Sequence, residues 1–150
     1  MMLRVAATDD LPQILALDRS ADGAAHWPAA EYAAAINTFA TPPRRIFVAD
    51  DDANLQGFVC VKFVAGIAEI ENIAVDAQAR RRGIGRGLVD AAAVWARDLG
   101  AHSLQLEVRA GNTSALGLYA AMGFVIAGRR AAYYSSPVED AVLLDLAIGQ

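Results

Sequence analysis

Cysteine is almost absent from the sequence, and this scarcity excludes several kinds of protein. Cys60 is the only cysteine among 150 residues, so the chain has no internal disulfide framework and no cysteine zinc site, and it suits a reducing compartment. Aromatic residues make up 7% and charged residues 20% of the composition, against 55% for hydrophobic residues. That balance is typical of a globular protein, and the length predicts one domain over 1–150 with a core of its own.

Positive charge is also in short supply, with 13 Lys and Arg against 17 Asp and Glu, a net charge of -4 and a pI near 5.0. An acidic protein is a poor candidate for direct nucleic-acid binding. The N-terminus lacks the apolar core of a signal peptide. The longest run without charge, 110–128, is interrupted by Gly111, Asn112 and Gly123, which favours loop, helix, turn and strand over a membrane span. We therefore expect a soluble, cytoplasmic protein without membrane contact.

Metal-binding patterns are missing as well. The 2 histidines, His26 and His102, have no partner at the spacing of metal ligands. The acidic run Asp50–Asp52 lacks the spacing and the distal Glu of a calcium loop, so we interpret it as a solvated turn. No metal is expected.

Apolar periodicity predicts elements in the order β-α-α-β-β-β-α-β-α-β-β, which is a mixed α/β domain with one sheet flanked by helices. The clearest strand is 103–109, where apolar and polar residues alternate. The clearest helix has one apolar face and should end at Gly100. That face consists of Leu88, Ala92, Trp95 and Leu99. The other strands are expected at 3–6, 46–49, 55–64, 68–75, 124–126 and 141–146, with 129–140 as the connection before the last.

A basic, glycine-rich loop stands between an expected strand and the clearest helix. The strand ends in Ile73-Ala74-Val75, three arginines follow at 80–82, and glycines occupy positions 83, 85 and 87. Glycine leaves the backbone N–H groups accessible, and those of a helix's first turn have no partner within the helix. The helix dipole and the arginines add positive potential, so this order of elements predicts an anion site.

The identity of the anion is narrowed by what the loop lacks. A phosphate-binding loop of nucleotide hydrolases requires Gly-Lys-Ser/Thr, which is missing, and a dinucleotide fingerprint requires a third glycine where Leu88 stands. What remains is Arg80-x-x-Gly83-x-Gly85. On these six residues alone, an anion site and a flexible basic surface turn are equally good interpretations.

A second stretch decides between them. Leu106-Glu107-Val108-Arg109-Ala110-Gly111-Asn112 is followed by Leu118-Tyr119 and by Gly123-Phe124. Together with the Arg80 loop, this stretch resembles the GNAT superfamily of acetyltransferases, and within it the RimI-type N-terminal acetyltransferases. The resemblance implies the GNAT acyl-CoA N-acyltransferase fold, with a central, mostly antiparallel sheet flanked by helices. It also implies acetyl transfer from acetyl-CoA to the N-terminal alanine of a ribosomal protein, with no metal.

The resemblance also implies roles for individual residues. Glu107 matches the family's general base, and Tyr119 matches the residue that protonates or stabilises the departing thiolate. The residues expected to hold acetyl-CoA are Ile73, Ala74 and Val75 along the pantetheine arm, Arg81, Arg82, Gly83, Ile84, Gly85 and Arg86 around the pyrophosphate, and Asn112 further along.

Each of these residues also has a plainer interpretation. Glu107 lies on the polar side of a strand, where a surface residue is the usual finding. Tyr119 lies on the apolar stripe of its helix and fits simple packing. Asn112 fits a helix N-cap, and Cys60, within a strand, fits a buried small hydrophobe.

Two positions depart from the pattern of the family. Ala132 stands where RimI-type members commonly have Asn before a Tyr-Tyr pair, and Gly117 interrupts a helix. The first departure leaves acceptor recognition open. The alternatives are therefore a GNAT enzyme for a small amine or another protein N-terminus, and a non-catalytic acyl-CoA-binding module.

Overall fold

Strands and helices follow one another in the order that the periodicity predicts. The computed structural model describes residues 2–21, 24–52, 54–80 and 82–149. Within these ranges the strands are β1 (Met2–Val5), β2 (Arg44–Asp51), β3 (Asn54–Val64), β4 (Ile67–Val75), β5 (Ser103–Arg109), β6 (Val125–Ser135) and β7 (Val138–Ala147). The α-helices are α1 (Leu11–Ser20), α2 (Ala29–Ile36), α3 (Ile84–Asp98) and α4 (Thr113–Ala121), with 3-10 turns at Thr8–Asp10 and Ala77–Ala79.

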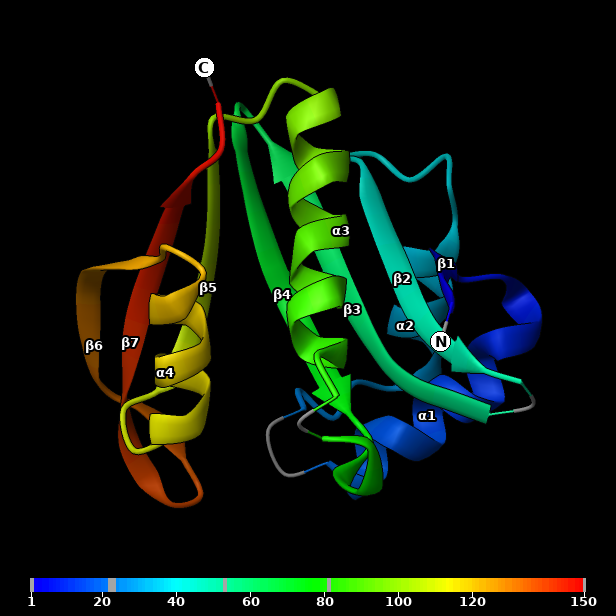
Figure 1. The fold of residues 1–150 in the computed structure, drawn as a ribbon, viewed down its shortest axis with the longest axis horizontal. Helices are drawn as coiled ribbons and strands as arrows, with labels where there is room; N and C mark the ends of the chain where they lie inside the picture. The colour runs from blue at the N-terminus through cyan, green and yellow to red at the C-terminus, as the bar shows by residue number, and fades with distance from the viewer. Residues whose placement is uncertain (1, 22–23, 53, 81, 150) are drawn as a thin grey trace.

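All seven strands belong to one sheet, in the order β1-β2-β3-β4-β5-β7-β6 (Figure 1). Neighbouring strands are antiparallel except for β4 and β5, which are parallel. The expectation of a mixed, mostly antiparallel sheet is confirmed. A parallel pair needs a crossover connection, and α3 supplies it between β4 and β5.

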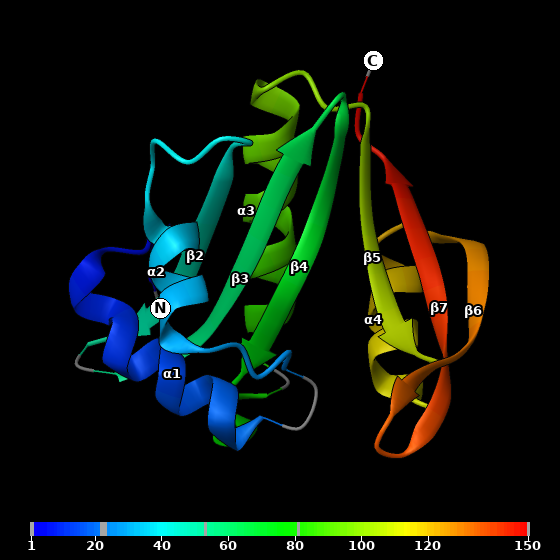
Figure 2. The same ribbon diagram turned by 180° about the vertical axis from the view of Figure 1, so that it is seen from behind.

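Helices cover both faces of the sheet, and β3 shows how its side chains divide between them. Val59 and Val61 belong to a core with α3, whereas Phe58 and Cys60 belong to a core with α1 and α2. We call these sides the α3 face and the α2 face. The figures show α3 and α4 over one face and α1 and α2 over the other (Figures 1 and 2). Cys60 is fully buried, as predicted.

Helix α3 confirms its predicted position, with one correction to its buried stripe. Leu88 and Ala92 are fully buried, but Leu99 is 43% exposed. The helix ends at Asp98, so Leu99 lies beyond its last turn and the fully buried Ala96 takes its place in the stripe. Gly100 has a φ of 92° and ends the segment as expected.

The prediction for the C-terminal strands was too short. Residues 129–140 do not form a simple connection, because β6 extends to Ser135 and pairs with β7 as a hairpin. Almost every residue of β6 is exposed, and β6 is an edge strand that pairs on one side only. A strand without a buried face has no apolar alternation, which is why the predicted strand, 124–126, covered only the start of β6.

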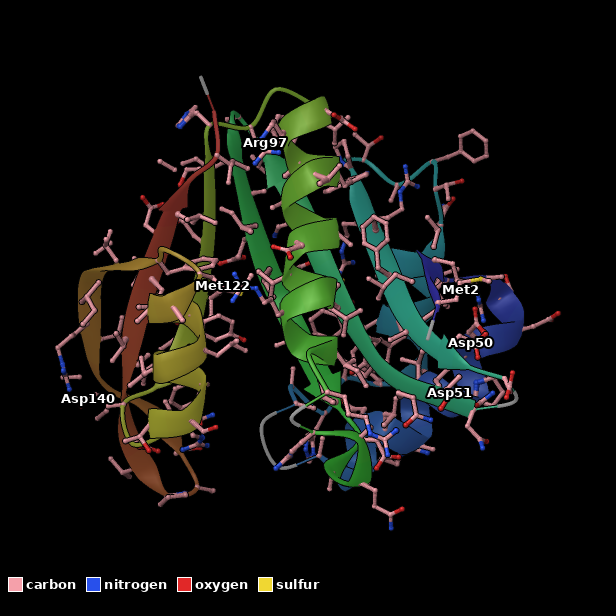
Figure 3. All side chains as sticks on the ribbon, viewed as in Figure 1. Met2, Asp50, Asp51, Arg97, Met122 and Asp140 are labelled. Carbon is pink, nitrogen blue, oxygen red and sulfur yellow. The ribbon has the colours of Figure 1, made fainter. Side chains whose placement is uncertain are left out.

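Parallel pairing between β4 and β5 is confined to one end of the two strands. It covers Ile67 with Ser103, Ala68 with Leu104 and Glu69 with Gln105, and then stops. The same end is reinforced by Arg97, whose Nε donates to the carbonyl of Ile148 at 2.9 Å (Figure 3). From there the two strands diverge, as both views of the ribbon show. The sheet is therefore joined at one end and splayed at the other.

Candidate active site

The predicted site lies where β4 and β5 separate. After the last pair, Glu69 with Gln105, strand β4 continues to Val75 and strand β5 to Arg109 without pairing to each other. A bulge in the pairing of β3 with β4, between Cys60 and Val61, changes the alternation of β4 at this point. The predicted segment Ile73–Val75 thus has a backbone edge that β5 does not use, which is what an extended ligand needs.

The first turn of α3 follows directly. Gly83 is its N-cap with a φ of 76°, a conformation that favours glycine. No described side chain caps the helix, and its first turn contains no acidic residue. The N–H groups of Ile84, Gly85 and Arg86 are the first-turn donors, because the first helical bond runs from Gly87 N to Gly83 O at 3.0 Å.

Exposed arginines surround this turn. Arg82 and Arg86 are exposed, whereas Arg81, which was also predicted to bind the pyrophosphate, lies outside the described residues. Gly57 of β3 lets the helix approach the sheet: a Cβ there would lie 2.9 Å from the carbonyl oxygen of Ala74 and 3.1 Å from Leu88 Cδ1. Unused amides and positive charge at a helix start make an anion site.

Helix α4 lies against the same turn. A Cβ built on Gly85 would lie 3.6 Å from Leu118 Cδ2 and 3.8 Å from Val75 Cγ2. Three segments that the sequence separates, the end of β4, the start of α3 and the middle of α4, therefore come together.

Tyr119 is on the α3 face beside these segments. Its side chain is 5% exposed and packs edge-on against Phe124, with ring centroids 5.5 Å apart. Burial raises the pKa of Tyr119 to about 12. No described residue forms a hydrogen bond with its hydroxyl group. The packing interpretation is correct for the ring, and the hydroxyl group is left for another partner.

Glu107 is on the α2 face. Leu106 and Val108 join the α3 core, so Glu107 between them points to the opposite side of β5. Its side chain is 15% exposed, and its Oε1 lies 3.2 Å from Arg130 Nη2. Its Oε2 is buried and has no hydrogen-bond partner among the described residues. A buried carboxylate oxygen without a hydrogen-bond donor is uncommon.

Sequence reasoning missed the charged neighbours of Glu107. Burial raises the pKa of Glu69; the positive charges of Lys62 and Arg130 oppose this rise, and the carboxylates of Glu71 and Glu107 add to it. The pairing register of β4 with β5 would have identified Glu69 as a neighbour, because Glu69 pairs with Gln105 and shares a face of the sheet with Gln105 and Glu107. Arg130 gave no signal, since it lies in the segment that was expected to be a connection.

Asn112 does cap α4. Its side-chain oxygen accepts a hydrogen bond from Ala115 N at 3.1 Å, and the residue is exposed. The cap uses the oxygen, which leaves the amide NH₂ group as the donor for a ligand.

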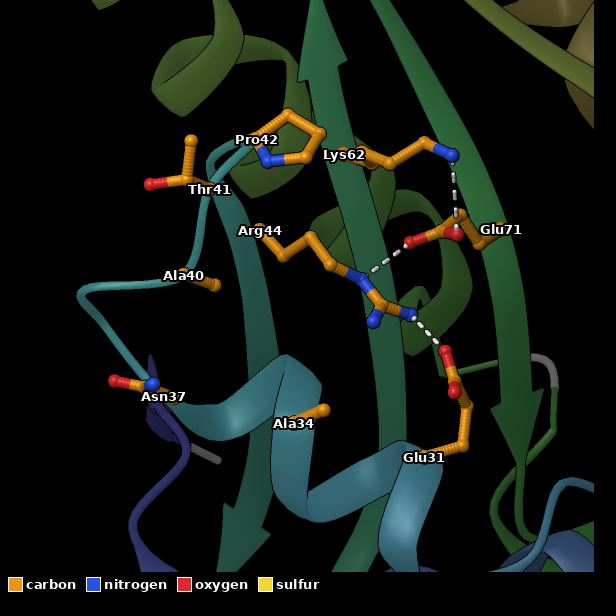
Figure 4. A pocket seen from close by; sticks show the side chains of 9 residues that line it. All are labelled: Glu31, Ala34, Asn37, Ala40, Thr41, Pro42, Arg44, Lys62 and Glu71. Atoms are coloured by element: carbon orange, nitrogen blue, oxygen red, sulfur yellow. Dashed lines mark hydrogen bonds and ion pairs between the residues drawn. The ribbon is translucent and has the colours of Figure 1, made fainter.

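A pocket of about 430 Å³ lies elsewhere on the α2 face (Figure 4). Its charged residues are paired with one another: Arg44 lies 2.8 Å from Glu31 and 3.0 Å from Glu71, and Lys62 lies 3.7 Å from Glu71. The pocket therefore has no net charge from these four groups. It is not the predicted anion site, which lies at the start of α3.

Neither a metal-ligand cluster nor a membrane-spanning helix is found in the described part of the chain. No group of three or more His, Cys, Asp or Glu residues there is arranged to hold a metal ion. None of the helices it contains combines the length and the apolar character needed to cross a membrane.

Known proteins resemble this chain over most of its length. The sequence model of the acetyltransferase (GNAT) family matches residues 9–124. The [ribosomal protein bS18]-alanine N-acetyltransferase of Salmonella typhimurium is 37% identical over 99 residues, which are 65% of this chain and 67% of that protein. The streptothricin acetyltransferase of Streptomyces lavendulae is 39% identical over 99 residues, 64% of this chain and 52% of that protein.

A solved structure extends the likeness to the fold. The crystal structure of the ribosomal-protein-S18-alanine N-acetyltransferase from Escherichia coli superposes with a TM-score of 0.84 at 28% identity, over 99% of this chain and 94% of that one. The alternative of a non-catalytic acyl-CoA-binding module is wrong, since these relatives are N-acetyltransferases. Acetyl-CoA is the co-substrate of the GNAT acetyltransferases. The chain belongs to the GNAT family of acetyltransferases, and it is an N-acetyltransferase.

Proposed function

We propose that the protein acetylates the N-terminal α-amine of a protein, and that its acceptor is the N-terminal alanine of a ribosomal protein. The observation that carries the proposal is the splay of β4 and β5. Tyr119 and the α3 amides lie on one face of this opening and Glu107 lies on the other. Acetyl-CoA and the acceptor amine can therefore meet there from opposite faces of the sheet. We infer the acceptor from the similarity of this chain to the bS18-alanine N-acetyltransferases. A ribosomal acceptor favours a cytoplasmic enzyme, and we treat 1–150 as one acetyltransferase domain.

The residues at the start of α3 fit acetyl-CoA. The described loop offers three first-turn amides, the arginines at 82 and 86 and no acidic side chain, which suits a pyrophosphate. The free edge of Ile73–Val75 suits the amide groups of pantetheine. When bound, acetyl-CoA supplies the acetyl thioester. The chain's own residues then have to hold the amine against it and accept one proton.

The acceptor amine must be neutral when it attacks. An α-amine, with a pKa of about 7.7–8, costs about 1 kcal/mol to deprotonate at pH 7, whereas a lysine near 10.4 costs about 4.6 kcal/mol. A carboxylate is an adequate base for the first but a poor one for the second. Glu107 accepts the proton through Oε2, directly or through one water, because that oxygen has no described partner. Orientation of the amine beside the thioester accounts for most of the acceleration.

Tyr119 acts as a hydrogen-bond donor rather than as a source of a whole proton. Burial raises its pKa to about 12, and a thiol has a pKa of about 8.5. Transfer of the proton to the departing thiolate is then uphill by about 5 kcal/mol. Donation of a hydrogen bond to the sulfur costs no such transfer and still stabilises the developing negative charge. The family resemblance pointed to protonation or stabilisation, and the buried position of Tyr119 favours stabilisation.

A small amine is the second candidate acceptor. The streptothricin acetyltransferase shares 39% identity over 99 residues, and Ala132 departs from the RimI-type pattern. In this case the same residues act on a free amine, without a peptide.

One assay separates the two acceptors. Purified protein is given acetyl-CoA with short peptides that begin with Ala, Ser or Met, with a peptide that is blocked at its terminus and carries Lys, and with free polyamines and a streptothricin. We expect CoA release with the free Ala-initiated peptide and none with the blocked one. Turnover of the polyamine or antibiotic alone would establish the second candidate. Binding of acetyl-CoA without release of CoA in any arm would overturn both.

A further inference from the structure

A closed ring of hydrogen bonds joins α1, α2 and β4 to the loop between the two helices. Tyr32 donates its hydroxyl hydrogen to Asp18 Oδ1 at 2.5 Å, and Asn72 Nδ2 donates to the Tyr32 oxygen at 2.6 Å. Ala25 N donates to Asn72 Oδ1 at 3.0 Å, and His26 N donates to Asp18 Oδ1 at 2.8 Å. Because Ala25 and His26 are consecutive, the ring closes through one peptide unit. Three side chains thus hold two adjacent amides of a loop.

The ring is buried, although the loop that it holds is exposed. Asp18 is 2%, Tyr32 0% and Asn72 5% exposed, whereas Ala25 and His26 lie at the surface. Tyr32 is also held by aromatic packing, edge-on against Phe58 with centroids 5.6 Å apart. A buried, closed ring of hydrogen bonds restricts the groups that it joins, and the loss of one member leaves buried groups unpaired. The loop therefore has one position in which the ring is complete.

One residue of the loop has a left-handed backbone conformation. His26 has a φ of 58°, which is unfavourable for any residue with a side chain except in special surroundings. The hydrogen bond that its backbone amide donates to Asp18 Oδ1 and the contact of its Nε2 with the carbonyl of Ala21 at 2.9 Å supply those surroundings. Strained backbone persists where the neighbours over-determine it, and such positions cluster at functional sites.

The ring reaches β4 at the edge of the candidate active site. Asn72 precedes Ile73–Val75, the segment proposed to bind pantetheine, and follows Glu71. Glu69 of the same strand interacts electrostatically with both Glu71 and Glu107. A continuous row along β4 therefore connects the general base with the loop, all on the α2 face.

We propose that the ring of Asp18, Tyr32 and Asn72 positions residues 24–27 as one wall of the acceptor site, and so determines how tightly the acceptor binds. This proposal rests on the proposed function, because it takes Glu107 as the base and the α2 face as the acceptor side. Trp27 of this wall packs against Tyr32 with centroids 5.1 Å apart, and the guanidinium of Arg44 lies 5.5 Å from its ring. The three ring side chains act through the loop, and we call them positioning residues.

The test compares Tyr32→Phe and Asp18→Ala with two controls. Asp18→Asn keeps an oxygen that accepts from Tyr32 and His26, so it should rescue what Asp18→Ala loses. Ile14→Val removes a methylene from a fully buried residue of the same core without touching the ring. All variants are assayed with the Ala-initiated peptide and with acetyl-CoA, and amide exchange of residues 24–28 is measured without substrates.

We expect Tyr32→Phe and Asp18→Ala to raise the acceptor KM about five- to tenfold, the loss that one or two hydrogen bonds produce. The KM for acetyl-CoA and kcat should stay within about twofold, and exchange at 24–28 should become faster. Asp18→Asn should stay near wild type, and Ile14→Val should lower Tm without changing either KM.

Two other results would overturn the inference. One is a lower Tm in Tyr32→Phe with an unchanged acceptor KM and unchanged loop exchange; the other is a fall in kcat alone. A wild-type protein that does not acetylate the peptide would instead contradict the proposed function. The exchange measurement would then still show whether the ring holds the loop.

Discussion

Glu107 and Arg130 form an ion pair that reaches over an intervening strand. Glu107 is on β5 and Arg130 on β6, with β7 between them, and Arg130 Nη2 lies 3.2 Å from Glu107 Oε1. The pair engages one carboxylate oxygen, while the buried Oε2 has no described partner. Under the proposed function, Arg130 would orient the carboxylate so that Oε2 is the oxygen that meets the acceptor amine.

Loss of Arg130 should affect catalysis more than stability. The Arg130 side chain is 58% exposed, and exposed ion pairs contribute about 0–1 kcal/mol. We expect Arg130→Met to leave the free energy of unfolding within about 1 kcal/mol and to lower kcat/KM about three- to tenfold, since the base loses its orientation. Arg129→Met is the matched control, because Arg129 is 57% exposed and pairs with Asp140 at 3.5 Å. Equal effects of the two substitutions would show that Arg130 has no special role.

Removal of the base should separate chemistry from binding. Glu107→Gln keeps the size of the side chain but cannot accept a proton, and a positioned general base contributes roughly 10²–10⁴-fold to the rate. We expect kcat to fall by at least about 100-fold, with the affinity for acetyl-CoA almost unchanged. Steady-state kinetics and calorimetric titration with acetyl-CoA measure the two effects. A parallel loss of affinity would mean that Glu107 supports the fold instead.

The raised pKa of Tyr119 predicts how the free energy of unfolding changes in alkaline solution. Burial raises its pKa to about 12, whereas an unfolded tyrosine has a pKa of about 10. Between these values the folded state keeps a proton that the unfolded state has released, so the free energy of unfolding falls as the pH rises, by up to about 3 kcal/mol. Tyr119→Phe lacks this contribution and should lose less stability than wild type between about pH 9 and pH 12. Urea unfolding at both pH values checks this, and identical losses would refute it.

The same substitution tests the catalytic role. Tyr119→Phe removes the hydroxyl group but keeps the ring that packs on Phe124. We expect kcat to fall about 10- to 1,000-fold, as for the loss of a donor to a developing anion. An unchanged kcat would leave Tyr119 as a packing residue.

Local pattern predicted some parts of the protein better than others. Alternation placed β5 at Ser103–Arg109 without error, because one of its faces is buried. The glycine-rich loop was expected before α3, and the structure places the N-cap of the helix at Gly83, so that Gly85 and Gly87 lie in its first turn. Only the start of β6 was predicted, at 124–126, and the rest of the strand, up to Ser135, has too few buried residues to show periodicity.

Contacts that depend on pairing across the sheet were out of reach. Arg130 meets Glu107 only through the registers of two strand pairs, β5 with β7 and β7 with β6. Tyr32 meets Asp18 and Asn72 across 14 and 40 residues of sequence. No periodicity or short motif encodes such distances, whereas the catalytic candidates were found because family resemblance links motifs that lie far apart.

Ala132 has a left-handed backbone conformation that would suit Asn better than Ala. It has a φ of 50° in the irregular part of β6, and its amide donates to Asp140 Oδ1 at 2.9 Å. The left-handed conformation costs a residue such as Ala roughly 1–2 kcal/mol. Asn tolerates this conformation better than Ala does. We expect Ala132→Asn to raise the free energy of unfolding by about 0.5–1 kcal/mol. Ala131→Asn is the control, because Ala131 does not have a positive φ; a gain there as large as at Ala132 would contradict the explanation.

Substitution of Gly85 by Ala should change protein stability and CoA affinity in opposite directions. A Cβ at this position would meet nothing closer than Leu118 Cδ2 at 3.6 Å and Val75 Cγ2 at 3.8 Å, which is ordinary contact. Gly85→Ala should therefore fold well and gain up to about 1 kcal/mol, since Ala is the better helix former. The new methyl group would stand among the first-turn amides that we propose for the pyrophosphate, so the Kd for CoA should rise at least about tenfold. Gly117→Ala in α4 is the matched control, because a Cβ at this position would have no atom within 4 Å beyond its chain neighbours and the backbone of its own helix. This substitution should show the gain in stability without the loss of CoA affinity. If Gly85→Ala bound CoA as tightly as Gly117→Ala does, the start of α3 would not be the pyrophosphate site.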